Sequence, residues 1–370
     1  MTIHAIVGGQ FGSEAKGHVA AEITQHYADK GISNLLVRIG GSNAGHSAVD
    51  ADGRTWALRQ IPAAAVIDRN APLILAQGSE IDVDVVMAEL DALDAANYNA
   101  SARLYIDPSA TIVEQRHHDL EAGSDLNKRT GSTNKGIGAA RADRLMRKAM
   151  TARDCQPLER WLTNTAKMIK REHTENDVNV IIEGTQGYGL GLHTDNYPQT
   201  TSGDCRTVDL LAQIGYAPLN PDANREVHTW LVCRTYPIRV AGNSGALLDE
   251  LEWSQLTEQS GGYIQPELTT VTRKTRRIGG WDVRLVRAAI EANGGTGRHL
   301  HPCLMFIDYL DPILAGARYI ETLHARKTTD AAIHIAEMTA DIGQPFDLFG
   351  TSPSTAMFDH AALTSTISNW

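Results

Sequence analysis

Cysteine is scarce in this chain, and its thiols follow no pattern. No two of them are spaced as Cys-x-x-Cys, which argues against a structural zinc site and against a disulfide framework. Scattered free thiols suit a reducing compartment, so we expect a cytoplasmic protein. The four cysteines are Cys155, Cys205, Cys233 and Cys303.

Long apolar runs and an excess of positive charge are also missing. No apolar run reaches the roughly 18 residues that a membrane-spanning helix needs, and no signal-like segment precedes the first predicted strand. The formal net charge is −10, which argues against a general nucleic-acid binder. We therefore expect neither a membrane nor a nucleic acid as a partner.

The chain instead contains a succession of short apolar segments separated by helical patterns. Its 370 residues are enough to bury a sizeable core. Apolar residues recur at helical spacing from Val83 to Leu93, after a predicted capping box of Ser79 and Asp82. Strands that alternate with helices predict an α/β fold with a mostly parallel central sheet covered by helices. The predicted strands are Thr2–Val7, Leu35–Ile39, Pro72–Ala76, Arg103–Ile106, Val178–Ile182, Thr229–Cys233, Cys303–Ile307 and Ala317–Ile320.

Residues 108–175 depart from this alternation, because they are polar and mostly helical in pattern. We interpret them as a helical insertion beside the sheet, with Trp161 and Leu162 as packing residues. No internal repeat, low-complexity tract or proline-rich linker divides the chain. We therefore treat 1–370 as a single α/β domain.

A glycine-rich turn follows the first predicted strand. Its sequence is Gly-Gly-Gln-Phe-Gly-Ser-Glu-Ala-Lys-Gly, from Gly8 to Gly17. Glycines let the backbone approach a phosphate, amides at a helix N-terminus favour negative charge, and Lys16 adds a positive charge. The turn matches neither a Walker A motif nor Gly-x-Gly-x-x-Gly. By itself the turn is weak evidence, because a plain tight turn between a strand and a helix remains an alternative of roughly one in three.

Further stretches combine glycine with polar or charged residues near the ends of predicted strands. Each has an ordinary explanation taken singly: a structural histidine, a solvated basic helix face, strand-end loop residues or a solvated basic loop. The stretches are Arg38–Ser47, Gly131–Gly138 with the following Arg141, Arg144 and Arg147, Glu183–Leu190, Tyr197–Ser202, Thr269–Gly279, Cys303–Asp308 and Gly350–Pro353.

Taken together and in order, these stretches resemble the motifs of the adenylosuccinate synthetase family. Gly-Gln-Phe-Gly-Ser-Glu-Ala-Lys-Gly is similar to the family's Gly-Gln-Trp-Gly-Asp-Glu-Gly-Lys-Gly, and Gly-Gly-Ser-Asn-Ala-Gly-His-Ser to its Gly-Gly-His-Asn-Ala-Gly-His-Thr. The resemblance runs from Ile3 to Pro353. It implies a P-loop-NTPase-like fold and a ligase that joins L-aspartate to a purine nucleotide with hydrolysis of a nucleoside triphosphate. It also implies Mg²⁺ as the cofactor and a homodimer.

The resemblance assigns roles to individual residues. Catalytic roles fall to Ser13, Lys16, His46 and Gln186, and the magnesium ligands would be Ser13 and Gly45. The nucleoside monophosphate would contact Ser13, Lys16, Asn43, Ala44, Gly45, His46, Thr133, Gln186, Thr201 and Lys274, together with Arg147 reaching across from a partner subunit. Aspartate would contact Thr270, Val271, Thr272, Lys274 and Arg276. The phosphate donor would contact Gly12, Ser13, Glu14, Ala15, Lys16, Gly17, His18, Gly45, His46, Ser47, Arg276, Phe306, Asp308, Gly350, Ser352 and Pro353.

Two departures from the family pattern bear on the substrates. Ser13 stands where the family has its catalytic Asp, and a serine hydroxyl cannot act unaided as a general base near pH 7. A shorter side chain leaves room for the 2-amino group of guanine, and the same exchange resembles a phage branch of the family that joins dGMP to aspartate. Phe306 stands where GTP-using members have Lys, while Asp308 is kept, so we expect ATP or dATP as the donor.

The sequence thus predicts a ligase that joins dGMP to L-aspartate through a 6-phosphoryl intermediate. Its product would be N6-succino-2-amino-2′-deoxyadenylate, a precursor of 2-aminoadenine DNA, made in the host cytoplasm if a phage encodes the chain. Two alternatives stay open: an IMP-dependent adenylosuccinate synthetase that uses GTP, and a non-catalytic regulator that binds purine nucleotides.

Overall fold

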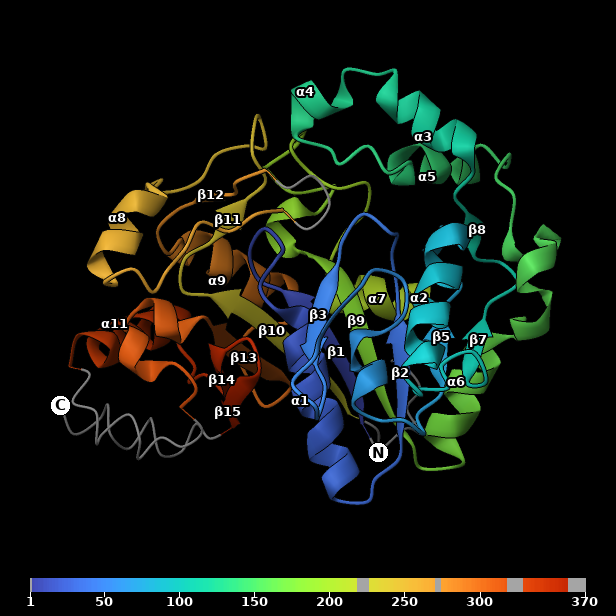
Figure 1. The fold of residues 1–370 in the computed structure, drawn as a ribbon, viewed down its shortest axis with the longest axis horizontal. Coiled ribbons are helices and arrows are strands. Elements are labelled where there is room, and N and C mark those ends of the chain that lie inside the picture. The colour runs from blue at the N-terminus through green and yellow to red at the C-terminus, as the bar shows by residue number, and fades with distance from the viewer. Residues whose placement is uncertain (1, 218–225, 270–273, 318–328, 359–370) are drawn as a thin grey trace.

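The structure is a computed structural model, and it describes residues 2–217, 226–269, 274–317 and 329–358. A nine-stranded sheet crosses the centre of the molecule in the order β15-β14-β13-β10-β1-β9-β2-β5-β7 (Figure 1). All its neighbouring strands are parallel except β14 and β15. The predicted mostly parallel α/β fold is therefore confirmed. The strands are β1 (Ile3–Gly8), β2 (Asn34–Arg38), β5 (Leu73–Leu75), β7 (Leu104–Ile106), β9 (Asn179–Gly187), β10 (Val227–Arg234), β13 (Leu300–Met305), β14 (Leu348–Ser352) and β15 (Thr355–Phe358).

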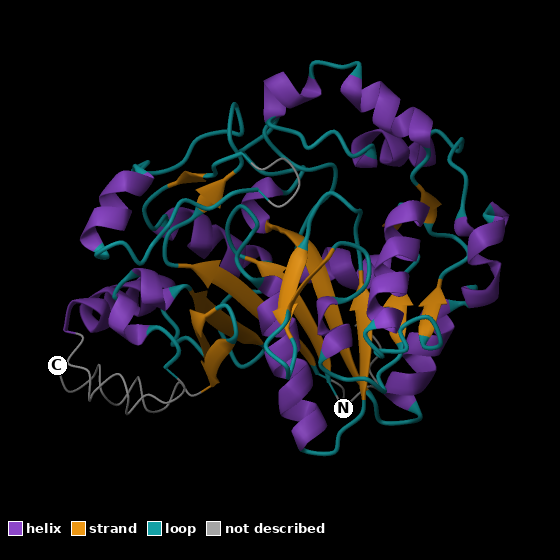
Figure 2. Ribbon diagram, viewed as in Figure 1, coloured by secondary structure: helices purple, strands orange, loops and turns teal. Residues whose placement is uncertain are grey.

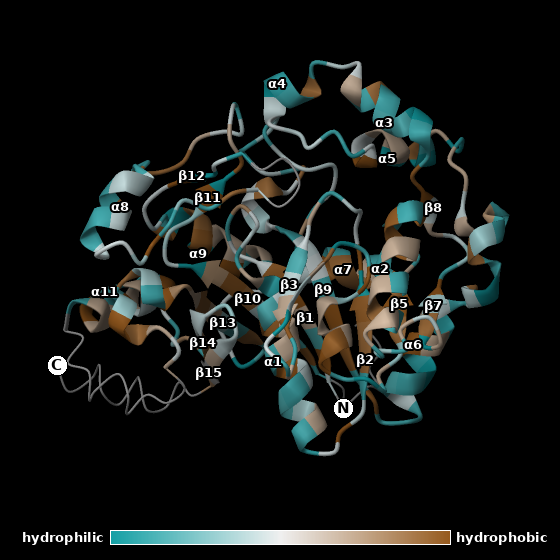
Figure 3. Ribbon diagram, in the orientation of Figure 1, coloured by the Kyte–Doolittle hydropathy of each residue, from teal (hydrophilic) through white to brown (hydrophobic). Residues whose placement is uncertain are grey.

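Helices cover both faces of this sheet, so its strands are apolar on both sides (Figures 2 and 3). Side chains alternate along β1: Ile6 belongs to the core on one face, whereas Ile3 and Val7 belong to the core on the other. The first core also contains residues of α1 (Lys16–Asp29) and α2 (Val83–Ala95). The second contains residues of α6 (Thr165–Thr174), α7 (Thr207–Gln213), α9 (Val283–Ala292) and α11 (Thr329–Ile342).

Shorter elements decorate the sheet. Three small two-stranded sheets are β3 (His46–Val49) with β4 (Thr55–Leu58), β6 (Glu80–Ile81) with β8 (Thr111–Ile112), and β11 (Ile238–Arg239) with β12 (Arg277–Ile278). The remaining helices are α3 (Gln115–Ala122), α4 (Leu126–Thr130), α5 (Ile137–Leu145), α8 (Trp253–Gln259) and the 3₁₀ helices η1 (Ala63–Val66), η2 (Ala152–Asp154), η3 (Gln156–Trp161), η4 (Tyr188–Leu190), η5 (Ile307–Tyr309) and η6 (Pro312–Leu314). No helix in the described ranges is long and apolar enough to cross a membrane.

The region 108–175 divides into two parts. Helices α3, α4 and α5 lie together at the top of Figure 1, away from the layers that cover the sheet. Helix α6 instead packs on the sheet, where Ile169 is buried in the second core. Trp161 is buried and its indole Nε1 donates to the carbonyl of Ser101 at 2.8 Å, while Leu162 packs beside it. The single-domain organisation stays a prediction.

Several predicted boundaries differ from the structure. Asp82 caps α2, accepting from the amide of Val85 at 3.3 Å, whereas the hydroxyl of Ser79 donates to the carbonyl of Arg38. The predicted capping box is therefore wrong for Ser79, which does not cap the helix, and right for Asp82. Strand β13 ends at Met305, because Phe306 takes a left-handed φ of 62°. The predicted strand Ala317–Ile320 lies, apart from Ala317, outside the described residues.

Strand β9 is longer than predicted. It continues through Gly187 because Gly187 still pairs with Gly8 of β1. Glu183, Gly184 and Gln186 therefore belong to the strand itself rather than to a loop after it.

Candidate active site

The carboxyl ends of the central strands meet at one edge of the sheet, where ligand sites of open α/β folds lie. Three cavities adjoin there. Cavity A has a volume of about 490 Å³, cavity B about 140 Å³ and cavity C about 310 Å³. Cavities A and B share Ser13, Gly45, His46 and Arg276. Cavities B and C share Phe11, Asn43, Gly131, Ser132, Thr133, Gln186, Leu190 and Val240.

The structure brings together most of the residues that the sequence assigned to ligands. Cavity A is lined by every predicted donor-contacting residue except Gly12, which lines cavity B. Cavity B also holds Ala44 and Lys274, and cavity C holds Thr201. The predicted aspartate contacts Thr270, Val271 and Thr272 lie outside the described residues. The roles of all these residues stay predictions.

The turn between β1 and α1 is organised around the buried carboxylate of Glu14. It accepts from the amides of Gln10 at 3.2 Å and Gly12 at 2.6 Å, and from Lys16 Nζ at 2.6 Å. A Cβ on Gly8 would lie 2.6 Å from an oxygen of this carboxylate, so glycine is required there. Glu14 thus fixes the turn and holds the ammonium group of Lys16 at the N-terminus of α1.

Ser13 and Ala15 both take left-handed backbone conformations, with φ of 57° and 69°. The hydroxyl of Ser13 accepts a hydrogen bond from Nη1 of Arg276, at the boundary between cavities A and B. A predicted catalytic position and a predicted aspartate-binding cation are therefore in direct contact.

His46, at the start of β3, belongs to a buried charged network. Its Nδ1 lies 2.5 Å from Oε1 of Glu183, which also accepts from Arg38 at 2.8 Å. The other oxygen of Glu183 accepts from the amide of Ala63 at 2.8 Å. Burial would raise the pKa of Glu183, but the charge of Arg38 and these hydrogen bonds hold it below its ordinary value.

The protonation of His46 is set by opposing effects. Its Nε2 lies 3.2 Å from the carbonyl of Thr185, whereas its Nδ1 faces both an acceptor, Glu183, and a donor, Nη1 of Arg38 at 2.6 Å. Burial and then the charge of Arg38 lower the pKa of His46 to about 4, and the hydrogen bond and charge of Glu183 oppose this fall. The desolvation of the buried ring is the larger effect, so the ring is neutral at pH 7.

Aromatic and acidic side chains line part of cavity A, among them Phe306, Asp308 and Tyr263, and two further charged residues contact them. The guanidinium of Arg234 lies 4.0 Å from the centroid of Phe306 and pairs with Glu267. Asp308 is buried, and its Oδ2 accepts from the hydroxyl of Tyr263 at 2.8 Å. Arg234, Glu267 and Tyr263 are residues that the sequence analysis missed, and only the strand-end position of Arg234 could have indicated it.

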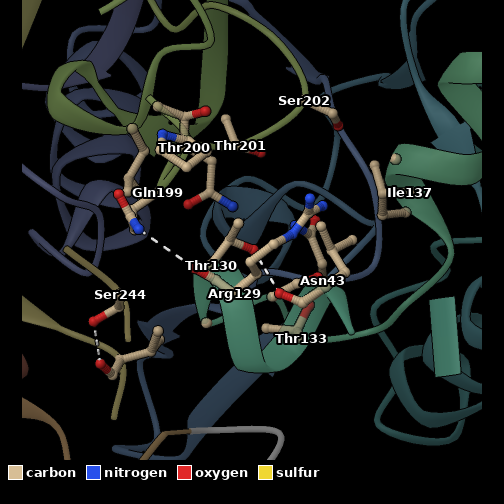
Figure 4. A pocket seen from close by; sticks show the side chains of 18 of the residues that line it. Asn43, Arg129, Thr130, Thr133, Ile137, Gln199, Thr200, Thr201, Ser202 and Ser244 are labelled. Atoms are coloured by element: carbon tan, nitrogen blue, oxygen red, sulfur yellow. Dashed lines mark hydrogen bonds between the residues drawn. The ribbon is translucent and has the colours of Figure 1, made fainter. Parts of the chain in front are cut away.

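Cavity C brings residues from five segments of the chain around one space, and Figure 4 shows the side chains of many of them. Asn43 and Thr133 lie on one side and Thr201 on another, as expected for groups that bind one nucleotide. Arg129 also lines this cavity, and its carbonyl accepts from the amide of Gln199 at 3.3 Å. The sequence analysis missed Arg129, because nothing in its spacing distinguishes it from its charged neighbours.

Arg147 is exposed and lines none of the three cavities. Its φ is 60°, and its Nη1 donates to the carbonyl of Leu145 at 2.9 Å. Its predicted contact with a partner's site stays a prediction.

The chain offers few protein ligands to a divalent ion. No group of three His, Cys, Asp or Glu in the described part of the chain could hold a metal. Ser13 and Gly45 line cavities A and B together, but the Ser13 hydroxyl faces Arg276 and the nearby Glu14 is paired with Lys16. A magnesium ion at this place would take most of its ligands from phosphate and water oxygens, and Mg²⁺ with Ser13 and Gly45 as its protein ligands stays a prediction.

Comparison with known proteins agrees with this site. Residues 5–172 and 152–340 match the adenylosuccinate synthetase family model. The adenylosuccinate synthetases of Thermococcus sibiricus and Pyrococcus horikoshii are each 32% identical to this chain, over 355 and 349 residues. These alignments cover 95% and 94% of this chain and 96% and 95% of the relatives.

The chain belongs to the adenylosuccinate synthetase family. It is thus a purine nucleotide–aspartate ligase, which sets aside a purely regulatory role. Succinoaminodeoxyadenylate synthetase (PurZ) of cyanophage S-2L, solved with dGMP and with dATP as an energy donor, has a similar structure. The TM-score is 0.76 at 25% identity, and the match covers 100% of this chain and 99% of the phage enzyme. Fully ligated adenylosuccinate synthetase from Plasmodium falciparum has the same fold, with a TM-score of 0.78 at 19% identity. The match covers 97% of the present chain and 100% of the Plasmodium enzyme.

Proposed function

We propose that this synthetase joins L-aspartate to dGMP, with ATP or dATP as the phosphate donor, and forms N6-succino-2-amino-2′-deoxyadenylate. The observation that carries the proposal is a hydroxyl, in place of the family's carboxylate, where cavities A and B meet. The resemblance to the phage enzyme that was solved with dGMP and dATP supports it.

The acceptor base would lie in cavity B, against Ser13 and Gln186. Guanine carries a 2-amino group beside N1, and a serine side chain is short enough to leave room for it and can accept a hydrogen bond from it. An aspartate at position 13 would occupy that room and would form an ion pair with Arg276, whose guanidinium already reaches Ser13. The phosphate end of dGMP would lie in cavity C, near Thr133 and Thr201.

The reaction would then proceed in two steps. The 6-oxygen of guanine attacks the γ-phosphorus of the donor, the nucleoside diphosphate leaves, and the N1 proton passes to solvent. The amine of aspartate then attacks C6, inorganic phosphate leaves, and the nitrogen gives up a proton to solvent. Mg²⁺, when bound, supplies positive charge to the phosphates.

Individual side chains fit these steps. Lys16 and the amides at the start of α1 would hold the phosphates of the donor. His46 would donate a hydrogen bond to the transferring phosphoryl group, whose negative charge raises the affinity of the ring for a proton. Arg276 would leave Ser13 to pair with a carboxylate of aspartate, because a guanidinium binds carboxylate with two hydrogen bonds.

A second candidate function is IMP-dependent adenylosuccinate synthesis with GTP. It is favoured by the curated relatives, which are named adenylosuccinate synthetases and are 32% identical over nearly the whole chain. The two candidates differ in the acceptor and in the donor, so one panel of substrates separates them.

The test is phosphate release with L-aspartate and each pair formed from dGMP or IMP and from ATP, dATP or GTP. We expect release with dGMP and ATP or dATP to exceed release with IMP by at least tenfold in kcat/KM. A higher value with IMP would establish the second candidate instead. No release with either acceptor would contradict both.

A further inference from the structure

The part of cavity A that is lined by Phe306 and Asp308, where the base of the donor would lie, contains a hydrogen bond that no part of the reaction scheme uses. Tyr263, in the loop after α8, donates its hydroxyl to Oδ2 of Asp308 at 2.8 Å. Asp308 is 3% exposed, and among the described residues its other oxygen, Oδ1, has no hydrogen-bond partner although it is buried. Both residues line cavity A.

A buried acceptor without a hydrogen-bond partner is unfavourable, so the carboxylate of Asp308 has an unmet demand for a hydrogen-bond donor. Burial raises the pKa of Asp308 to about 6, and the hydrogen bond from Tyr263 opposes that rise. The carboxylate therefore remains mostly ionised at pH 7 and is an acceptor only.

The aromatic wall here does not distinguish one purine from another, because any purine can stack on Phe306. The hydroxyl of Tyr309 donates to Glu267 at 3.1 Å, and Glu267 also pairs with Arg234. Asp308 and the side-chain amide of Gln265 line the same cavity. The carboxylate of Asp308 is an acceptor only, so it responds to the hydrogen-bond donors on the edge of the base.

We propose that Tyr263 is a specificity-determining residue for the phosphate donor, because its hydroxyl takes up acceptor capacity of Asp308 that the two neighbouring donors of guanine would otherwise use. Guanine presents two neighbouring donors, N1–H and the 2-amino group, which fit a carboxylate with both oxygens free. Adenine presents one exocyclic amine, which needs a single acceptor. The Tyr263–Asp308 pair thus favours adenine over guanine. This inference rests on the adenine-nucleotide donor of the proposed function.

The experiment compares Tyr263→Phe with the wild type and with Tyr309→Phe as a matched control. Both variants remove one phenolic hydroxyl from the wall of cavity A, but the hydroxyl of Tyr309 reaches Glu267 and not Asp308. The readout is the ratio of kcat/KM for GTP to that for ATP, at saturating aspartate and with whichever of dGMP and IMP turns over faster.

Tyr263→Phe frees Oδ2, and we expect the GTP-to-ATP ratio to rise at least tenfold, while Tyr309→Phe leaves it unchanged. Adding Tyr263→Phe to Asp308→Asn should not raise the ratio, because the second carboxylate oxygen is then absent. An unchanged ratio in Tyr263→Phe, or an equal rise in Tyr309→Phe, would overturn the proposal.

Binding provides a second readout that does not depend on the acceptor. Calorimetric titration with non-hydrolysable ATP and GTP analogues, without acceptor or aspartate, should show the same shift in affinity ratio for Tyr263→Phe. If dGMP fails as an acceptor, the proposed function is wrong, but this ratio still decides the role of Tyr263. An affinity ratio equal to that of the wild type would contradict that role.

Discussion

Ser13 is the residue at which the chemistry of this site departs from that of its family. Its hydroxyl lies where cavities A and B meet and already accepts a hydrogen bond from Arg276. A carboxylate there would add a charge and extend towards the acceptor base. Under the proposed function, the identity of this side chain would control both the space beside N1 of the base and the freedom of Arg276.

Restoring the carboxylate with Ser13→Asp should shift preference from dGMP towards IMP. The longer side chain crowds the 2-amino group of guanine, which IMP lacks. We expect the ratio of kcat/KM for dGMP to that for IMP to fall at least tenfold, about 1.4 kcal/mol. Ser13→Asn, of similar size but without charge, is the control: an equal fall there would assign the effect to size alone, and an unchanged ratio in Ser13→Asp would refute the steric argument.

Glu183 should act as a positioning residue for His46. In Glu183→Gln the amide no longer balances the charge of Arg38 beside the ring, so protonation of His46 becomes harder. We expect kcat to fall by roughly 100-fold, within the range for acid–base groups, with little change in KM for either nucleotide. A rise in KM with an unchanged kcat would show that Glu183 supports binding and not the orientation of His46.

Residues of the site differ in how well a sequence reveals them. Lys16, His46 and Gln186 stand in contiguous motifs, so a local pattern was enough to find them. Tyr263 and Asp308 are in contact although they lie 45 residues apart in the sequence, and Arg234 and Glu267 are in contact at a separation of 33 residues. Such pairs depend on how distant strands and loops assemble, which no local pattern encodes.

Among the elements, the turn that joins β1 to α1 carries visible strain. Ala15 precedes the first residue of α1 at a φ of 69°, where the family signature has glycine. A left-handed conformation costs a residue with a Cβ roughly 1–2 kcal/mol. The methyl group of Ala15 packs against the first core, which offsets part of that cost.

Ala15→Gly should therefore raise the free energy of unfolding by about 1 kcal/mol, because the relief of strain exceeds the loss of one partly buried methyl group. Urea unfolding followed by circular dichroism measures the change. Ala20→Gly, in the helical interior of α1, is the matched control and should destabilise the protein. A loss of stability in both variants would show that the turn at Ala15 is not strained.

The strands show how far a sequence pattern predicts an element. Strands such as β1 and β2 were found because both faces are buried, which produces continuous apolar runs. The extent of β9 was missed because Glu183 is charged, and its pairing with Arg38, together with its contacts to His46 and the amide of Ala63, lets it lie in a buried strand. Two-residue strands such as β11 and β12 were missed because they are too short for a period to appear.

At the scale of the whole molecule, stability should depend on pH through buried histidines outside the site. His4 is buried, and its Nδ1 accepts from Nε1 of Trp230 at 3.1 Å. Burial, followed by the charges of His228 and His301, lowers the pKa of His4 to about 3. The unfolded chain therefore binds a proton below pH 6.5 that the folded protein excludes.

The stability that neutral His4 contributes is fully present above pH 6.5 and is lost as the pH falls towards 3. Between pH 7.5 and 5 this loss is about 2 kcal/mol. In His4→Gln, which does not titrate, the fall in unfolding free energy over the same interval should be smaller by that amount. Urea titrations at both pH values measure it. An equal fall in both proteins would mean that His4 is protonated in the folded state.

We further propose that two copies of the chain form a homodimer with shared sites, because Arg147 matches the family residue that reaches a partner's site and lines none of the three cavities of its own chain. Arg147→Leu and Lys16→Ala should each abolish most activity, but a mixed dimer of the two would contain one site with both residues intact. Isolated mixed dimers should therefore recover roughly half of the wild-type activity, and a random mixture of the two variants roughly a quarter. Heterodimers verified by affinity tags that remain inactive would contradict shared sites.

The central claim concerns the acceptor, and a competition reaction tests it most directly. Equal concentrations of dGMP and IMP are incubated with the wild-type protein, L-aspartate, Mg²⁺ and dATP, and both products are quantified by mass spectrometry at low conversion. Because the two acceptors compete for one site, the product ratio equals the ratio of their kcat/KM values. We predict that N6-succino-2-amino-2′-deoxyadenylate exceeds adenylosuccinate by at least tenfold. An excess of adenylosuccinate would contradict the account.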